Sequence, residues 1–159
     1  MSGLNRQLET WLLRLLALQF AGLILTVLWQ VLARNVLQRA ALWTLDVAQL
    51  LFAWGIFLGA AVALRRDTHF HLELFPAHWR GINALLKCLG DLAALAVALV
   101  MLLAGWQFAQ RGWNREVLTL GISEFWYFLS IPLAGALMLC FLGEILPRDL
   151  GRLREHLGP

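Results

Sequence analysis

The hydrophobic pattern is dominated by four long runs that contain no charged residue. They cover residues 15–33, 47–64, 92–110 and 125–143, and shorter polar stretches separate them. At about 1.5 Å of helix rise per residue, each run is close to the roughly 30 Å thickness of a bilayer's hydrocarbon core. The pattern predicts an all-α integral membrane protein with four transmembrane helices, forming a single membrane domain over residues 1–159.

A polar stretch, RRDTHFHLELFPAHWRG, follows the second run at residues 65–81. It mixes aromatic and aliphatic residues with Arg, His and Glu, so it is too polar to cross the bilayer. Such a mixture is typical of a segment that lies in the headgroup region. We expect an amphipathic connector between the second and third helices, on the cytoplasmic side.

The basic residues predict how the helices are oriented. One side of the membrane would hold nine of them: Arg6, Arg14, Arg65, Arg66, Arg80, Lys87, Arg148, Arg152 and Arg154. The other would hold four: Arg34, Arg39, Arg111 and Arg115. Cytoplasmic loops carry the excess of Lys and Arg, so both termini are predicted to be cytoplasmic.

Composition agrees with a membrane protein. Apolar residues make up 60% of the chain and charged residues 14%, well below the roughly 25% of soluble domains. The net charge of +3 does not predict a nucleic-acid partner, because the basic residues lie at helix ends. The first apolar run lacks a small-residue cleavage site, so we expect it to remain as an anchor.

Small residues at a spacing of four predict close helix packing in two of the runs. One ridge consists of Gly55, Gly59 and Ala63, and the other of Gly90, Ala94 and Ala98. In lipid, small side chains let two helices approach until van der Waals contact holds them together. The first ridge can pack in the chain's own core, which is the favoured interpretation, or form a seam with a partner protein. Pro132, in the last run, is expected to distort its helix.

The sequence offers no catalytic, cofactor or metal site. No run has an ionisable residue near its centre, which argues against a proton- or ion-coupled carrier. All four histidines lie outside the runs, so a bis-histidine haem between the helices is excluded. His69 and His71 resemble a metal-ligand pair, but a structural role for them is favoured. Cys88 and Cys140 fit no metal or redox spacing. An enzyme is therefore not predicted.

Arg34 and Asp46 end consecutive antiparallel helices on the same side of the membrane. They can form an ion pair across that hairpin, or remain two separately solvated charges.

Three stretches resemble the small, Q-type (DctQ-like) membrane subunit of tripartite ATP-independent periplasmic (TRAP) transporters. They are QVLARNVL at 30–37, LLFAWGIFLGAAVALRRDTHFHLEL at 50–74 and IPLAGALMLC at 131–140. The positions that match recurrent family residues are Arg34, Asp46, Gly59, His69, Glu73 and Pro132. The chain departs from the family pattern at Asn35, where a tyrosine is usual. It also keeps only the second acid, Asp46, of a Trp-x-Glu-Glu motif that begins at Trp43.

The resemblance implies a multi-pass protein of the bacterial inner (cytoplasmic) membrane that takes part in secondary active transport. Such a subunit packs against a large membrane subunit, which carries the sodium and substrate sites, so no cofactor is expected here. A periplasmic substrate-binding protein delivers the solute, an organic acid such as a dicarboxylate or a sialic acid. The expected partners are these two proteins and membrane lipids, and the expected role is that of a static scaffold.

The connection between the third and fourth runs supplies candidate contacts for the binding protein: Arg111, Trp113, Arg115 and Glu116.

The alternative to a transporter subunit is a stand-alone small membrane protein, either a homo-oligomeric carrier or an assembly factor. The absence of an interior charge argues against the carrier but not against the assembly factor.

Overall fold

The computed structural model describes residues 3–66 and 80–157. Its helices are α1 (Gly3–Asn35), α2 (Trp43–Arg65), α3 (Arg80–Arg111), the single turn α4 (Phe125–Phe128) and α5 (Ser130–Leu157). Two short antiparallel strands, β1 (Glu116–Val117) and β2 (Ile122–Ser123), form a hairpin between α3 and α4. The amphipathic connector, with His69, His71 and Glu73, lies largely outside the described residues.

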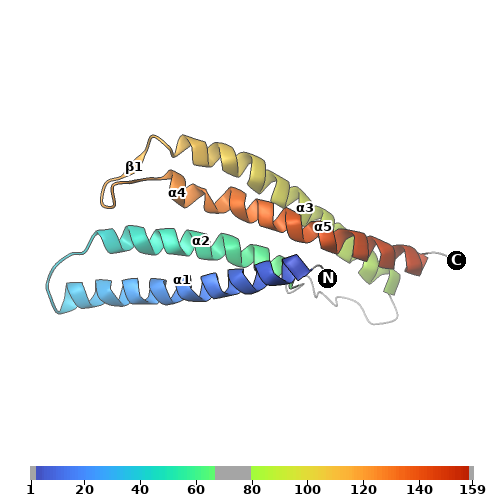
Figure 1. Cartoon of the computed structure of the whole chain (residues 1–159), viewed down its shortest axis with the longest axis horizontal. Coiled ribbons are helices and arrows are strands. Elements are labelled where there is room, and N and C mark those ends of the chain that lie inside the picture. The colour runs from blue at the N-terminus through green and yellow to red at the C-terminus, as the bar shows by residue number, and fades with distance from the viewer. Residues whose placement is uncertain (1–2, 67–79, 158–159) are drawn as a thin grey trace.

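The prediction of an all-α membrane protein with four spanning helices is confirmed. Four helical segments are long and apolar enough to cross a bilayer: Gln7–Asn35, Trp43–Arg65, Leu86–Arg111 and Phe125–Pro147. The helices extend beyond the charge-free runs, because residues such as Leu, Arg, Gln and Glu favour helix in water as well as in lipid. The start of α1 and the end of α5 lie at the same end of the molecule (Figure 1). Which end is cytoplasmic stays a prediction.

The four long helices form an open row rather than a closed bundle. α1 packs on α2, α2 packs on α5, and α5 packs on α3, so that α1 and α3 lie at the two edges (Figure 1). This leaves many large apolar side chains exposed, among them Leu18, Phe20 and Leu25 on α1. An apolar surface this broad would cause aggregation in water, and it is suited to lipid or to a membrane partner.

The core lies in the half of the row nearest the chain termini, where α2, α3 and α5 meet. Ala61 of α2, Ala98 of α3 and Phe141 and Leu142 of α5 are almost completely buried there. Leu12 adds the first part of α1 to this cluster. We call this half the terminal end, and the opposite half, which carries β1 and β2, the hairpin end.

Helices α3 and α5 make the closest helix contact in the structure. A Cβ placed on Gly135 of α5 would lie 2.8 Å from the backbone nitrogen of Leu102 and 2.9 Å from the carbonyl oxygen of Ala98. A Cβ on Gly105 of α3 would lie 2.7 Å from Ile131 Cγ2. Two glycines on facing helices therefore set the distance between α3 and α5, and neither belongs to the predicted ridges.

The predicted ridges differ in what they contact. Ala98 is buried in the core and Ala94 packs against it, on the α3 face that meets α5. On α2, Gly55 faces Gln19 of α1, whereas no described atom lies within 4 Å of a Cβ placed on Gly59. Ala63 and Gly90 are half-buried. The favoured packing of this ridge inside the chain is thus not observed at Gly59 among the described residues, and a partner seam there is the alternative that stays open.

The expected distortion near Pro132 takes the form of a break between α4 and α5. Pro132 lies in the first turn of α5, and Leu129 separates the two helices. A proline clashes with the carbonyl group four residues earlier, here that of Phe128, which is the last residue of α4. The proline inside a continuous helix is Pro147, which the hydrophobic pattern placed beyond the last span.

Replacing Gly135 by alanine should destabilise the protein. The added methyl group would meet backbone atoms of α3 that no side-chain rotation can move away, and overpacking of this kind costs about 1–3 kcal/mol. Gly143→Ala is the matched control on the same helix, because a Cβ there meets no described atom within 4 Å. Unfolding temperature in mild detergent should fall for Gly135→Ala and stay level or rise for Gly143→Ala. Equal behaviour of the two variants would contradict the close contact.

Candidate partner-binding surface

The β1–β2 hairpin is fixed to the end of α3 and the start of α4. The hydroxyl of Ser123 lies 2.8 Å from the carbonyl oxygen of Gly112 and 3.0 Å from that of Trp113, and it accepts a hydrogen bond from the backbone N–H of Phe125. The turn contains Gly121 in the left-handed region, with φ +62°, a conformation that glycine adopts without strain. The hairpin is thus held against the ends of α3 and α4 by the side-chain hydroxyl of Ser123.

The four predicted docking residues all lie at the hairpin end. Arg111 is exposed at the end of α3, and Glu116 is exposed in β1. Trp113 is exposed while its ring packs edge-to-face on Phe125, with 4.9 Å between ring centroids. Arg115 forms an ion pair with Glu124 at 3.2 Å, although its side chain is 70% exposed. Arg111 is the basic residue of this set for which the structure shows no acidic partner among the described residues.

Leu118 is a surface feature that sequence reasoning missed. It lies in the turn between β1 and β2 and is 98% exposed. A leucine in a polar connection gives no signal by itself, because the hydrophobic pattern does not show which side chain stands at a turn. With Trp113 it adds an apolar component to a surface that looked mainly charged.

Asp46 connects the α1–α2 half of the row to the hairpin end of the other half. Its carboxylate accepts a hydrogen bond from the hydroxyl of Thr119, and its backbone carbonyl accepts one from the hydroxyl of Tyr127 at 2.9 Å. The indole N–H of Trp54 donates to the carbonyl oxygen of Trp126, also at 2.9 Å. These three hydrogen bonds form what we call the hairpin-end clasp.

Of the two alternatives for Arg34 and Asp46, the structure does not show the ion pair. Among the described residues Arg34 makes no ion pair and stands exposed at the end of α1, while Asp46 bonds to Thr119. The reason lies in the tertiary fold, because the turn between β1 and β2 reaches Asp46 from a distant part of the chain. The other family-matched position in this half, Pro132, is buried at the start of α5.

A second clasp joins the ends of α1 and α2 at the terminal end. Glu9 accepts a hydrogen bond from Arg65 Nε at 2.8 Å and another from Arg66 Nε at 2.9 Å. Arg65 is only 6% exposed, and its guanidinium carbon lies 5.0 Å from the centre of the Phe141 ring. This terminal-end clasp was not predicted, because Glu9 precedes the first charge-free run and lies 56 residues from Arg65 in the sequence.

The described residues contain no group of three or more His, Cys, Asp or Glu side chains that could hold a metal ion. His69 and Glu73 lie outside the part of the chain that the structure describes, so a role for them stays a prediction. Neither Cys88 nor Cys140 forms a disulfide. The arrangement at hand offers surfaces and anchoring contacts rather than a reaction centre.

The family comparison decides the class of protein. The model for the DctQ component of tripartite ATP-independent periplasmic transporters matches residues 23–151, from the middle of α1 into the last part of α5. The chain belongs to the DctQ family. This confirms the resemblance noted in the sequence and identifies a multi-pass membrane protein of a transporter-component family, which is not a family of enzymes.

Two relatives of this chain differ greatly in length from each other. The sialic acid TRAP transporter small permease protein SiaQ of Vibrio cholerae serotype O1 is 32% identical over 119 residues, which cover 74% of this chain and 69% of that protein. The sialic acid TRAP transporter permease protein SiaT of Haemophilus influenzae is 28% identical over 141 residues, covering 84% of this chain but 21% of that protein. The second match is thus to one part of a much longer permease.

Replacing Glu9 by glutamine should destabilise the DctQ-family chain more than removing the surface charge of Arg115. Glu9→Gln leaves the guanidinium of Arg65, which is only 6% exposed, without a counter-charge, and losing the charged partner of a buried group costs about 1–3 kcal/mol. Arg115→Gln breaks an exposed pair, worth at most about 1 kcal/mol. Unfolding temperatures in detergent compare the two. A Glu9 variant as stable as the Arg115 variant would show that the terminal-end clasp contributes little.

Proposed function

We propose that this protein is the small permease subunit of a TRAP transporter and acts as a rigid scaffold. In this role it packs against a large membrane subunit and keeps that subunit at a fixed depth and tilt. The large subunit carries the substrate and the coupling sodium ions. The DctQ match over residues 23–151 is the observation that carries the proposal.

The longer relative supports a large membrane partner. SiaT contains a region similar to most of this chain, and that region makes up about a fifth of the permease. Where the equivalent of this chain is continuous with a larger permease, the two parts are held together by a covalent link. A small subunit that is a separate chain would need a binding surface in place of that link.

The open row supplies such a surface. Many large apolar side chains of the row are exposed, especially on α1, whose main neighbour is α2. This exposed apolar area is larger than in a closed bundle of four helices, and part of it can bind a partner. The two clasps and the close α3–α5 contact make the row stiff. Stiffness lowers the entropy lost when a surface binds its partner, and it suits a part that holds another part in place.

The transported solute is proposed to be an organic acid, with a sialic acid as the first compound to test. Both relatives are named for sialic acid transport. The central parts of the four spanning helices carry no ionisable residue, so a carboxylate and its sodium ions would be bound in the large subunit. A substrate-binding protein is proposed to deliver the solute at the hairpin end.

Purification of the tagged protein from its native membranes in mild detergent tests the scaffold proposal. We expect one large polytopic membrane protein to be recovered in equal amount, identified by mass spectrometry. Recovery of this chain alone as a defined homo-oligomer would contradict the proposal and favour a stand-alone carrier or an assembly factor. A strain that lacks the chain should also lose sodium-dependent uptake of the solute.

Reversing the charge of Arg111 should weaken delivery by the binding protein. Arg111→Glu removes an exposed positive charge at the hairpin end, and losing electrostatic attraction slows association by roughly tenfold at low salt. Uptake is measured in proteoliposomes that contain both membrane subunits, with the binding protein titrated from below to above saturation. The defect should appear at low binding-protein concentration and vanish at saturation.

Arg39→Glu is the matched control, because Arg39 is exposed in the connection between α1 and α2, away from the β hairpin. An equal defect in both variants would mean a general effect of charge at this end of the protein. Unchanged uptake in Arg111→Glu would remove that residue from the docking surface.

A further inference from the structure

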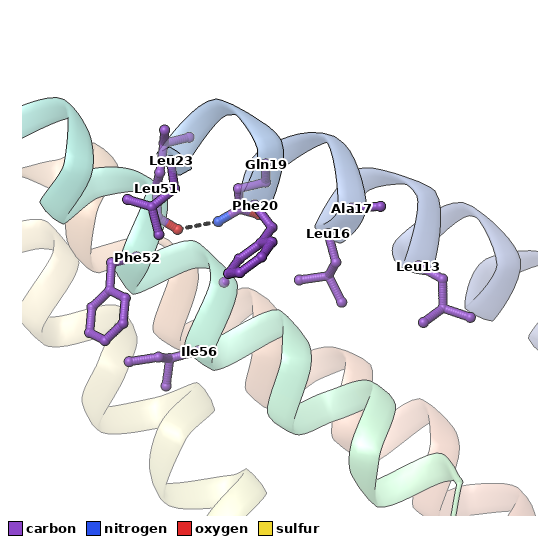
Figure 2. A pocket seen from close by; sticks show the side chains of 10 residues that line it. Leu13, Leu16, Ala17, Gln19, Phe20, Leu23, Leu51, Phe52 and Ile56 are labelled. Carbon is purple, nitrogen blue, oxygen red and sulfur yellow. Dashed lines mark hydrogen bonds between the residues drawn. The ribbon is translucent and has the colours of Figure 1, made fainter. Parts of the chain in front are cut away.

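A groove runs between α1 and α2 on the membrane-spanning surface. It encloses about 500 Å³ and is lined mainly by aliphatic and aromatic side chains: Leu13, Leu16, Ala17, Gln19, Phe20 and Leu23 of α1, and Leu51, Phe52, Gly55 and Ile56 of α2. Figure 2 shows Leu13, Leu16 and Phe20 projecting from α1 into the space beside α2. Phe20, Phe52 and Ile56 are exposed, so the groove opens toward the lipid.

The polar residue in the groove has its hydrogen-bonding partner inside the protein. The side-chain amide of Gln19 donates to the backbone carbonyl of Leu51 (Figure 2). This bond crosses from α1 to α2 where Gly55 leaves room for it, and it holds the groove walls together. What remains for an occupant is an apolar channel.

The shape of the groove suits a hydrocarbon chain that enters from the membrane. Its lining extends about 15 Å along α1, from Leu13 to Leu23, and is almost entirely apolar. Because it opens toward the lipid, an acyl chain can lie in it without leaving the hydrocarbon core. The length of about 15 Å also equals one leaflet, half of the 30 Å hydrocarbon core.

The terminal end of the groove is positively charged. Arg66 follows Gly55 by eleven residues, about three helical turns, so it continues the α2 face that lines the groove. Its side chain is 50% exposed. Glu9 is the one acid in the terminal-end clasp and is shared with Arg65, so the clasp keeps a net charge of +1. Arg14, next to Leu13 in α1, is exposed and adds a second positive charge near this end of the groove.

We propose that the groove holds one acyl chain of an anionic phospholipid, whose phosphate lies against Arg66. The apolar walls contact the chain, and the guanidinium group of Arg66 contacts the phosphate, a partner that arginine binds through charge-assisted hydrogen bonds. The lipid belongs to the leaflet at the terminal end. This inference requires only a membrane-spanning chain, so it stands or falls separately from the proposed scaffold function.

Native mass spectrometry of the full-length protein, purified in mild detergent, tests the proposal. The protein is mixed with phosphatidylglycerol or phosphatidylcholine that carry the same acyl chains. We expect one phosphatidylglycerol to be retained per chain in preference to phosphatidylcholine. Arg66→Gln should reduce that preference about fivefold, the factor that corresponds to about 1 kcal/mol per basic residue near an anionic lipid surface. Arg66→Lys should restore most of it.

Blocking the groove separates chain binding from headgroup binding. Ala17 lines the groove, so Ala17→Phe should fill it and reduce retention of both lipids. Ala21→Phe is the matched control, since Ala21 is exposed on the same helix one turn further and lies outside the groove. Arg34→Gln, at the other end of α1, is the matched charge control. Both controls should retain the lipid as the unmodified protein does.

A phosphatidylglycerol with a photoreactive group on its acyl chain supplies the location. After illumination the label should fall on peptides of α1 and α2 that contain the groove residues. Equal retention of both lipids by the unmodified protein would overturn the proposal. So would an Ala17→Phe variant that keeps its lipid, or a label confined to other helices.

Discussion

The close contact of α3 and α5 is the constraint on which the rest of the row depends. Lipid solvates leucine as well as another helix does, so burying apolar surface drives association far less in a membrane than in water. Helices must then be held by van der Waals contact at short range and by hydrogen bonds. Gly105 and Gly135 bring the two backbones to the distance at which the first of these is strong. The α3–α5 pair is thus a firm base, and α2 packs on it through the buried cluster around Phe141.

The α1–α2 half of the row is attached to the α3–α5 half at both of its ends. At the terminal end Glu9 binds Arg65 and Arg66, with Arg65 lying over the ring of Phe141 on α5. At the hairpin end the hydrogen bonds of Asp46 and Trp54 reach the hairpin turn and α4. Polar contacts at both ends of a long helix resist tilting, because tilting would have to break one of them. α1 lies beyond this arrangement as an edge helix, with α2 as its main neighbour. That position leaves its other sides open to lipid or to a partner.

The sequence predicted the helices well and their mutual contacts poorly, for physical reasons. A spanning helix is a local property, since about 20 consecutive apolar residues satisfy it, and the four charge-free runs identified all four helices. The α3–α5 contact depends on which helices are neighbours, and a ridge motif such as Gly55 and Gly59 says only that some helix can approach. Glu9 and Arg65 lie 56 residues apart, so no local pattern joins them. Likewise, Asp46 binds Thr119 in the turn between β1 and β2. The sequence suggested Arg34 as its partner, because the two residues flank the connection between α1 and α2. The four candidate docking residues lie at one end because they are close together in sequence, and their role in docking stays a prediction. The pairing of Arg115 with Glu124 depends on the closure of the hairpin.

An open row exposes more surface than a membrane protein that works alone needs. In an assembly, the same exposed surface can bind a partner. A closed bundle buries its polar contacts at the centre and shows lipid a minimum of surface. The row instead has a small buried core at its terminal end, and the middle of its spans carries no ionisable residue. Both features support the proposal that a charged solute is bound by another chain. The open row exposes two faces. In the proposed assembly one face contacts a permease, while the other, with the α1–α2 groove, contacts lipid. The close contact at Gly135 and the two clasps keep both faces rigid.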